Sequence, residues 1–486
     1  MENKVSDPSS KKFMMYSPHR KYETSIEDTI EPLELNEVTR SETMGLCLSL
    51  AQVQERYILF EEEPRVLILY ASGSFGCLRI PSGDYVASVG SLEKVIRSYC
   101  ILCDNEYKGD KDWIYTPLSV FKKRIRYKVK ELSRIMPSSN MNLGIIAEIA
   151  NEIKKEYYNY EAFIILHGTD TIGCTAPILS FMLENLKKTV IITSCLIPLS
   201  ETRNDASNNL ITALTIAGHY WIPEVCVLFG DGLYRGNRII KDGTSALDLI
   251  KSPNFPPLAN IESYFNIAWD SILYSNTKKP FNAFTSLESN LTSVSLFPFM
   301  SLETLNSVFV EGVKGNIYIT LGVIIGTYGL GNFPSNRPDL LEVIKKAIND
   351  GVIVINVTQC IKGDVSDIYE GAVILSKIGV INGLDMTLKC ALAKLSYLLG
   401  KGYPTEKIKK MMIKNLRGEI TNPKEELLFT VHTHEFLVNS SEIVREFFPN
   451  TVKRNNLVPT LLNEAAALVL VVNEFIGKKR YDRETA

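Results

Sequence analysis

A short polar turn near the middle of the chain carries side chains that can do chemistry. The run Ala162–Leu166 is apolar throughout, which is typical of a buried strand in a parallel sheet. It ends at the turn 167–171 (HGTDT), and an apolar pattern at helical spacing resumes over Ile178–Leu186. Ligands of open α/β sheets bind at such strand-to-helix turns. The Thr169 hydroxyl and the Asp170 carboxylate are therefore candidate functional groups, although both residue types also cap helices.

A second strand and turn of the same kind lies nearer the N-terminus. Val66–Tyr70 is a strand-like apolar run, and residues 71–76 (ASGSFG) follow it as a turn of small residues. The glycines of this turn let backbone approach a ligand closely. Taken alone, small residues after a strand fit any α/β fold.

The elements around these two turns alternate between strand and helix patterns. Ser91–Lys108, Leu143–Tyr157 and Asn208–Tyr220 have helical spacing. Thr189–Thr193 and Glu224–Phe229 are strand-like, and residues 113–135 have the pattern of antiparallel strands. The alternation predicts an α/β protein with a doubly wound, mainly parallel sheet.

A second, smaller α/β series begins near residue 293. Gly322–Ile325 and Val352–Val357 are strand-like, and Leu340–Asn349 and Met386–Leu399 are helical. Thr43–Phe60 and Val458–Ile476 also have helical patterns. We therefore expect five segments: a polar, partly disordered extension (1–62), a larger N-terminal domain (63–265), an irregular linker (266–292), a smaller C-terminal α/β domain (293–428) and a helical tail (429–486).

Composition narrows the functional class. The 53 basic and 55 acidic residues nearly balance, so nucleic-acid and membrane-surface binding are not expected. Basic and other residues alternate along the run 122–130 (KKRIRYKVK), which favours a solvated face of a strand or helix over a binding patch. The nine cysteines are scattered, mostly within apolar runs, which indicates free thiols in a reducing compartment. The N-terminus lacks the apolar core of a signal peptide, so we expect a cytoplasmic protein.

Several segments together resemble one family. They are HGTDT (167–171), IPL (197–199), LYRGNR (233–238), SPN (252–254), YGLGN (328–332), NVTQC (356–360), DMT (385–387) and NLRGE (415–419). Over residues 63 to 428, and in this order, the chain is similar to type I (cytoplasmic) L-asparaginases. The resemblance implies two α/β domains, assembly as a homodimer or homotetramer, and hydrolysis of L-asparagine to L-aspartate and ammonia. It implies neither a cofactor nor a metal.

The resemblance also implies roles for individual residues. Ser74 stands where the family's T-G-G-T-I-G turn carries its threonine nucleophile, and Thr169, Asp170 and Lys241 match the family's catalytic trio. The remaining matches are Tyr85, for the mobile catalytic tyrosine, and Ser138 with Ser139, in the turn that holds the substrate's α-carboxylate. Thr169 and Asp170 would contact the substrate as well.

The chain departs from the family pattern at the site itself. The departures are Ser74 and Ala71 in place of Thr, Ser72 in place of Gly, Pro137 in place of Asp, and Lys389 where Glu is common. Gly326 stands where many bacterial members carry an effector-linked arginine, so allosteric control is not implied. Serine offers the same oxygen as threonine but lacks the methyl group that restricts χ1, which we expect to reduce the rate about tenfold or more.

Three functions remain open at this point. The first is an active L-asparaginase with Ser74 as nucleophile. The second is a binding or regulatory protein with weak or no turnover, which the altered turn and Pro137 favour. The third is a related amidohydrolase that acts on glutamine or on a glutaminyl-type amide in a larger complex.

Overall fold

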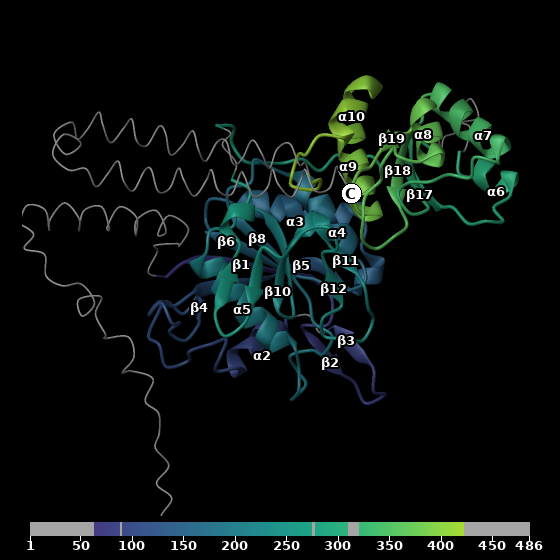
Figure 1. Cartoon of the computed structure of the whole chain (residues 1–486). Coiled ribbons are helices and arrows are strands. Elements are labelled where there is room, and N and C mark those ends of the chain that lie inside the picture. The colour runs from purple at the N-terminus through teal and green to yellow at the C-terminus, as the bar shows by residue number, and fades with distance from the viewer. Residues whose placement is uncertain (1–62, 88–89, 275–277, 310–319, 422–486) are drawn as a thin grey trace, which may run out of the picture.

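The computed structural model describes residues 63–87, 90–274, 278–309 and 320–421 (Figure 1). The expected polar extension (1–62), the helical tail (429–486) and the expected helices Thr43–Phe60 and Val458–Ile476 lie outside these ranges. The exact segment boundaries drawn from the sequence stay predictions.

A large mixed sheet forms the centre of the N-terminal half. Its strand order is β14-β13-β10-β9-β8-β6-β1-β5-β4, and β9, β8, β6, β1 and β5 run parallel. The strands are β1 (Arg65–Ser72), β4 (Ile114–Tyr115), β5 (Arg126–Met136), β6 (Ala162–Leu166), β8 (Thr189–Thr193), β9 (Val225–Phe229), β10 (Gly232–Arg235), β13 (Ala259–Ile261) and β14 (Phe265–Ile267). The expected antiparallel pairing within 113–135 is present as β4 with β5.

The order of the parallel strands creates a switch point beside β1. The chain enters at β1, adds β5 on one side and then adds β6, β8 and β9 on the other. Connections therefore leave β1 and β6 toward opposite faces of the sheet, and in sheets of this kind ligands bind outside the carboxyl ends of the strands at such a point. Tyr70 pairs in register with Leu166, and Ser72 pairs with Met136, so the turns after β1, β5 and β6 leave the same edge.

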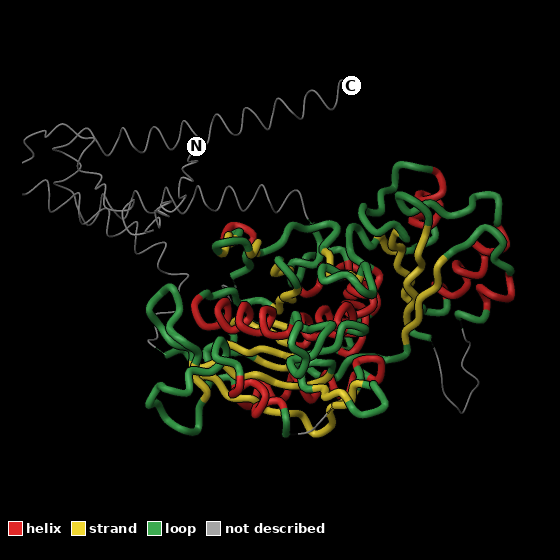
Figure 2. Tube along the Cα trace, turned by 90° about the horizontal axis from the view of Figure 1, so that it is seen from below, coloured by secondary structure: helices red, strands yellow, loops and turns green. Residues whose placement is uncertain are grey.

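Helices cover both faces of this sheet. Helix α5 (Ala206–His219), with α2 (Leu92–Ser98), packs on the face to which Val66 and Ile68 point. Helices α3 (Leu143–Glu156) and α4 (Ile172–Met182) pack on the face of Leu67 and Leu69. Figure 2 views the sheet nearly edge-on between these two layers. The doubly wound architecture expected from the sequence is confirmed.

The C-terminal half is a smaller α/β unit. Its parallel sheet contains β16 (Leu291–Ser295), β17 (Gly322–Thr327), β18 (Ile353–Thr358) and β19 (Ile381–Asn382) in that order. The helices are α6 (Leu302–Asn306), α7 (Pro338–Asn349), α8 (Glu370–Lys377), α9 (Leu388–Gly400) and α10 (Thr405–Met412). The layer of α9 and α10 faces the N-terminal half, where α9 lies against α4 (Figure 1).

Three two-stranded pairs complete the described structure. They are β2 (Cys77–Arg79) with β3 (Tyr85–Ala87), β11 (Ile240–Lys241) with β12 (Ile250–Lys251), and β7 (Leu183–Glu184) with β15 (Asn282–Ala283). The β2–β3 hairpin directly follows the turn 71–76, and β11 presents Lys241. None of the helices within the described ranges is long and apolar enough to cross a membrane.

Two expected helices have different bounds. Helix α4 begins at Ile172, not near Ile178, because the Thr171 carbonyl accepts hydrogen bonds from the N–H groups of Cys174 and Thr175. Pro177 therefore lies inside the helix, and pairing of β7 with β15 ends the helix at Met182. The helix expected over 91–108 stops at Ser98 because the next residue has an extended backbone.

Candidate active site

The turns after β1 and β6 touch each other through two glycines. Gly73 has a φ of +91°, and a Cβ added to it would lie 2.6 Å from the backbone nitrogen of Gly168. Gly168 in turn lies close to the side chain of Ser138, which follows β5. Only glycine fits at Gly73, because a side chain would meet backbone in a conformation that L-residues rarely adopt. The three turns therefore form one continuous surface at the switch point.

A lysine, a hydroxyl and a carboxylate meet at this surface. The Nζ atom of Lys241 donates hydrogen bonds to Thr169 Oγ1 at 3.1 Å and to Asp170 Oδ1 at 2.8 Å. The Lys241 side chain is 17% exposed and that of Asp170 is 60% exposed, so the cluster opens to solvent through the carboxylate. Asp170 also precedes the N-terminus of α4, where the helix dipole favours a negative charge.

Ser138 belongs to the same network. It is 3% exposed at the start of a short 3₁₀ turn, Ser138–Asn140. Its Oγ atom accepts a hydrogen bond from the Asp170 N–H at 3.2 Å, and its carbonyl accepts one from Thr171 Oγ1 at 2.7 Å. Ser139, the second residue expected to hold substrate, is exposed.

Ser74 sits partly buried in the turn that contacts Gly168. Its carbonyl accepts a hydrogen bond from the Cys77 N–H at 3.0 Å, which closes the turn. Within the described residues, the Ser74 hydroxyl makes no hydrogen bond of its own. The turn that carries Ser74 contacts Gly168 through Gly73, and Gly168 directly precedes Thr169.

Two residues to which the sequence analysis assigned no function hold the Ser74 turn in place. The buried Tyr70 hydroxyl donates to the Gly73 carbonyl at 2.9 Å and accepts from the Gly76 N–H at 3.2 Å. Burial raises the pKa of Tyr70, so its hydroxyl stays protonated. Ser72 Oγ accepts a hydrogen bond from the Gly168 N–H at 3.0 Å and thereby ties the two turns together.

Tyr85 lies apart from this network. It is 46% exposed on β3, and its hydroxyl donates to Glu201 Oε1 at 3.0 Å. That hydrogen bond to a carboxylate raises the pKa of Tyr85. Of the residues expected to be functional, the structure therefore joins Ser138, Thr169, Asp170 and Lys241 by hydrogen bonds. No hydrogen bond among the described residues joins Ser74, Ser139 or Tyr85 to this network.

His167 supports the turn and does not take part in proton exchange near neutral pH. Its ring is fully buried, and its Nδ1 atom lies 2.7 Å from the Gly168 carbonyl, which makes Nδ1 the protonated nitrogen. Burial lowers the pKa of His167 to about 4.

A lysine from the C-terminal half approaches the same site. A Cβ added to Gly173, in the first turn of α4, would lie 3.4 Å from Lys389 Nζ and 3.9 Å from the Lys241 backbone nitrogen. Lys389 is the second residue of α9, which packs on α4. Within the described ranges, no three His, Cys, Asp or Glu side chains gather as a possible metal site.

Comparison with known proteins finds two family models that match this chain. The family model "Asparaginase, N-terminal" matches residues 65–273, and "Glutaminase/Asparaginase C-terminal domain" matches residues 291–412. The chain is 38% identical to an L-asparaginase of Dirofilaria immitis over 375 residues, which is 76% of this chain and 62% of that protein. It is 38% identical to L-asparaginase 1 of Escherichia coli K12 over 307 residues, or 61% of this chain and 85% of that one.

Further relatives extend the comparison. A "60 kDa lysophospholipase" of Homo sapiens is 35% identical over 75% of this chain and 63% of its own length. The chain thus spans less than two thirds of the nematode and human relatives, at 62% and 63%. The crystal structure of L-asparaginase I from Vibrio cholerae is 33% identical with a TM-score of 0.63, covering 74% of this chain and all of its own. With both family domains matched in order, this chain belongs to the asparaginase family.

Proposed function

We propose that this protein hydrolyses L-asparagine to L-aspartate and ammonia, with the Ser74 hydroxyl as nucleophile. One observation carries the proposal: Lys241 Nζ bridges Thr169 Oγ1 and Asp170 Oδ1 next to the turn that presents Ser74. A serine hydroxyl is a weak nucleophile at neutral pH and needs a base, which a hydroxyl–amine–carboxylate cluster provides.

The reaction then runs in two halves. The Ser74 oxygen attacks the side-chain amide carbon, and its proton passes through the Thr169–Lys241 pair to the leaving nitrogen, so that ammonia departs and an ester remains. Water attacks this ester with the same groups as base, which releases L-aspartate and restores the hydroxyl. Backbone N–H groups near Thr169 stabilise the oxyanion of each step. Asp170 pairs with the substrate's α-ammonium, and Ser138 and Ser139 hold its α-carboxylate.

The direct test is ammonia release from L-asparagine by the purified chain. Ser74→Ala should lower kcat at least a hundredfold, because removing the nucleophile leaves only binding and oxyanion stabilisation. Ser133→Ala, at an exposed serine of β5, is the matched control and should keep the parent rate. Equal rates for the parent and Ser74→Ala would refute the proposal.

One observation favours the alternative of a binding protein with little turnover. The Gly168 N–H, which borders the Thr169 cluster, is already satisfied by the Ser72 hydroxyl, where the family pattern has a glycine without a side chain. One backbone donor beside the reacting carbonyl is therefore occupied. Calorimetric binding of L-asparagine without ammonia release would establish this alternative.

We further propose that the protein acts in the cytoplasm as a homodimer or homotetramer, without nucleic-acid or membrane partners. The eight described cysteines are all unpaired, five of them buried, which agrees with a reducing compartment. Light scattering after size-exclusion chromatography tests the assembly, and a monomer at micromolar concentration would contradict it.

A further inference from the structure

A cavity of about 250 Å³ lies between the two halves of the molecule, at the opposite end of α4 from the candidate active site. Its walls come from the segment that ends α4 and β7, from the edge of β9 and β10, from the linker at Leu273, and from the loop 415–419 that follows α10. Leu183, Leu186, Leu273 and Leu416 provide apolar surface. Cavities between domains with mostly apolar walls and a few polar groups are typical ligand sites.

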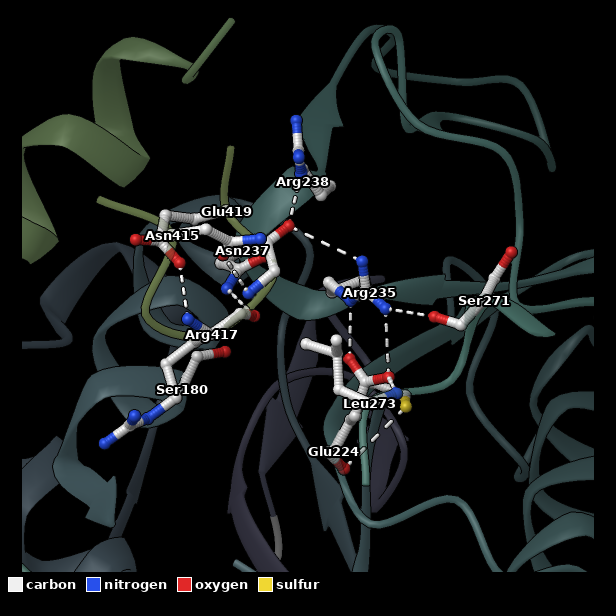
Figure 3. Close-up of polar contacts among 12 residues, drawn as sticks. Ser180, Glu224, Arg235, Asn237, Arg238, Ser271, Leu273, Asn415, Arg417 and Glu419 are labelled. Carbon is white, nitrogen blue, oxygen red and sulfur yellow. Dashed lines mark hydrogen bonds and ion pairs between the residues drawn. The ribbon is translucent and has the colours of Figure 1, made fainter. Parts of the chain in front are cut away.

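Two charged residues that line this cavity form an ion pair with each other, so their charges cancel. Arg235 and Glu224 have side chains only 4% and 6% exposed, and two hydrogen bonds of 2.5 and 3.0 Å join them. Arg235 also donates to the Ser271 carbonyl, and Glu224 accepts from the Leu273 N–H at 2.7 Å (Figure 3). This pair contributes no net charge and leaves Glu224 without spare affinity for a cation.

Arg417 is the exception among the charged residues of the cavity. Its Nη1 atom donates to the Leu416 carbonyl at 2.9 Å, while its buried Nε atom has no hydrogen-bond partner. No carboxylate in the described part of the chain pairs with this guanidinium. In Figure 3, Arg417 lies on the side of the cluster away from Ser271. The cavity therefore carries one uncompensated positive charge, and a buried donor without a partner is costly.

The backbone around Arg417 is fixed before any ligand arrives. Glu419 is fully buried, and its carboxylate accepts hydrogen bonds from the N–H groups of Leu416 and Arg417. The same carboxylate forms an ion pair with Lys394 at 2.5 Å. Gly418 has a φ of +77° and packs against the Arg235 guanidinium. Such pre-organisation reduces the entropy lost when a ligand binds.

We propose that this interdomain cavity binds a small monocarboxylate with a short apolar body. The carboxylate pairs with the Arg417 guanidinium, which offers Nε and Nη donors in the planar fork that suits a carboxylate. The apolar body lies against Leu183, Leu186, Leu273 and Leu416. This site is separate from the Lys241 cluster and does not depend on asparagine hydrolysis.

The test is calorimetric titration of the full chain with hexanoate, with hexan-1-ol as the neutral probe. Hexanoate should bind one site per chain, and hexan-1-ol should bind at least tenfold more weakly because it lacks the charge. Arg417→Gln should weaken hexanoate at least tenfold, and Arg417→Lys should weaken it less. Leu273→Trp should abolish binding by filling the cavity while keeping the backbone N–H that Glu224 needs.

The matched control is Arg134→Gln, at an exposed arginine of β5, which should bind hexanoate like the parent. Unfolding temperatures measured for all variants separate lost binding from lost structure. The proposal is overturned if hexanoate does not saturate the parent, if hexan-1-ol binds equally well, or if Arg417→Gln and the parent have equal affinity. A change of oligomeric state in Arg417→Gln without hexanoate binding to the parent also overturns it, since the guanidinium would then pair with another copy.

Discussion

At the scale of single residues, the candidate site depends on side chains that do no chemistry themselves. Tyr70 bridges Gly73 and Gly76 and so fixes the turn that carries Ser74. Ser72 connects that turn to Gly168. Neither residue was predictable as a site residue, because a tyrosine in an apolar strand is normally read as core. Ser72 was visible only as a departure from the family's glycine.

Removing the Tyr70 hydroxyl should loosen the Ser74 turn. In Tyr70→Phe, the Gly73 carbonyl and the Gly76 N–H lose their partner, which we expect to lower the free energy of unfolding by about 1–2 kcal/mol and kcat about tenfold. Urea unfolding and ammonia release measure the two effects. Tyr158→Phe, at a tyrosine that is 77% exposed, should change neither quantity. An unchanged kcat in Tyr70→Phe would show that the turn needs no such support.

Restoring threonine at residue 74 should raise the rate. The added methyl group restricts χ1 and positions the attacking oxygen, so we expect about a tenfold gain in kcat for Ser74→Thr. Ser133→Thr, at an exposed strand position, serves as the control. No gain would mean that another feature, such as the occupied Gly168 N–H, limits turnover.

Buried histidines should make stability depend on pH. Burial lowers the pKa of His219 to about 4 from an ordinary 6.5, so the unfolded chain binds more protons between these values. Stability conferred by the neutral ring is therefore complete above pH 6.5 and is lost as the pH falls toward 4, by up to about 3 kcal/mol.

His219→Phe provides the test for this linkage. The variant keeps a ring against Phe121, whose centroid lies 4.8 Å from the His219 ring. Its unfolding temperature should fall less than that of the parent between pH 7 and pH 4.5, because the variant loses the contribution of His219 and keeps that of His167. Parallel declines in the two proteins would rule out His219 as a source of the pH dependence.

At the scale of elements, the position of the site follows from strand order. The sequence predicted the strands before both turns and the alternation of strand and helix, because buried parallel strands have continuous apolar runs. It misplaced the start of α4, since Pro177 reads as a helix start although here it lies within the helix. The close approach of Gly73 to Gly168 could not be read from either segment alone, because it depends on the registers of β1 and β6.

Gly73→Ala tests whether this contact between turns matters. Gly83→Ala is a matched control, because Gly83 has a similar φ of +96° but open space where a Cβ would be. Both variants should lose about 1 kcal/mol from backbone strain. Only Gly73→Ala should also lose most of its activity, because its Cβ pushes the two turns apart. Equal rates in the two variants would contradict this account.

At the scale of the whole molecule, buried polar contacts join the two halves. Arg238 forms an ion pair with Asp385 at 2.6 Å, and it donates to the Gly418 carbonyl at 2.6 Å. Glu184 of β7 binds Lys401 and Tyr397 of the C-terminal half. The two-domain plan was predictable from the repeated strand–helix pattern. These contacts were not, because burial of a charged residue cannot be read from one sequence.

Breaking the Arg238–Asp385 pair should weaken the junction. Asp385→Asn leaves a buried guanidinium without its carboxylate, which typically costs about 3–5 kcal/mol. Calorimetry should show a lower unfolding temperature and separate transitions for the two halves. Asp339→Asn, which breaks the exposed pair with Arg337, should leave the thermogram nearly unchanged. A single unshifted transition in Asp385→Asn would show that the junction holds without this pair.

The segment 415–419 also decides where the protein can be truncated. The family match ends at residue 412, yet shortly after it the Gly418 carbonyl accepts a hydrogen bond from Arg238 of the N-terminal half, and Glu419 pairs with Lys394. A gene trimmed to the match would encode every strand and helix described above. Its product would keep the Arg238–Asp385 and Glu184–Lys401 pairs but would lack the Gly418 carbonyl to which Arg238 donates. Extending the trimmed protein by nine residues, to Thr421, restores the hydrogen bond from Arg238 to the Gly418 carbonyl and adds the one from the Thr421 N–H to Asp385.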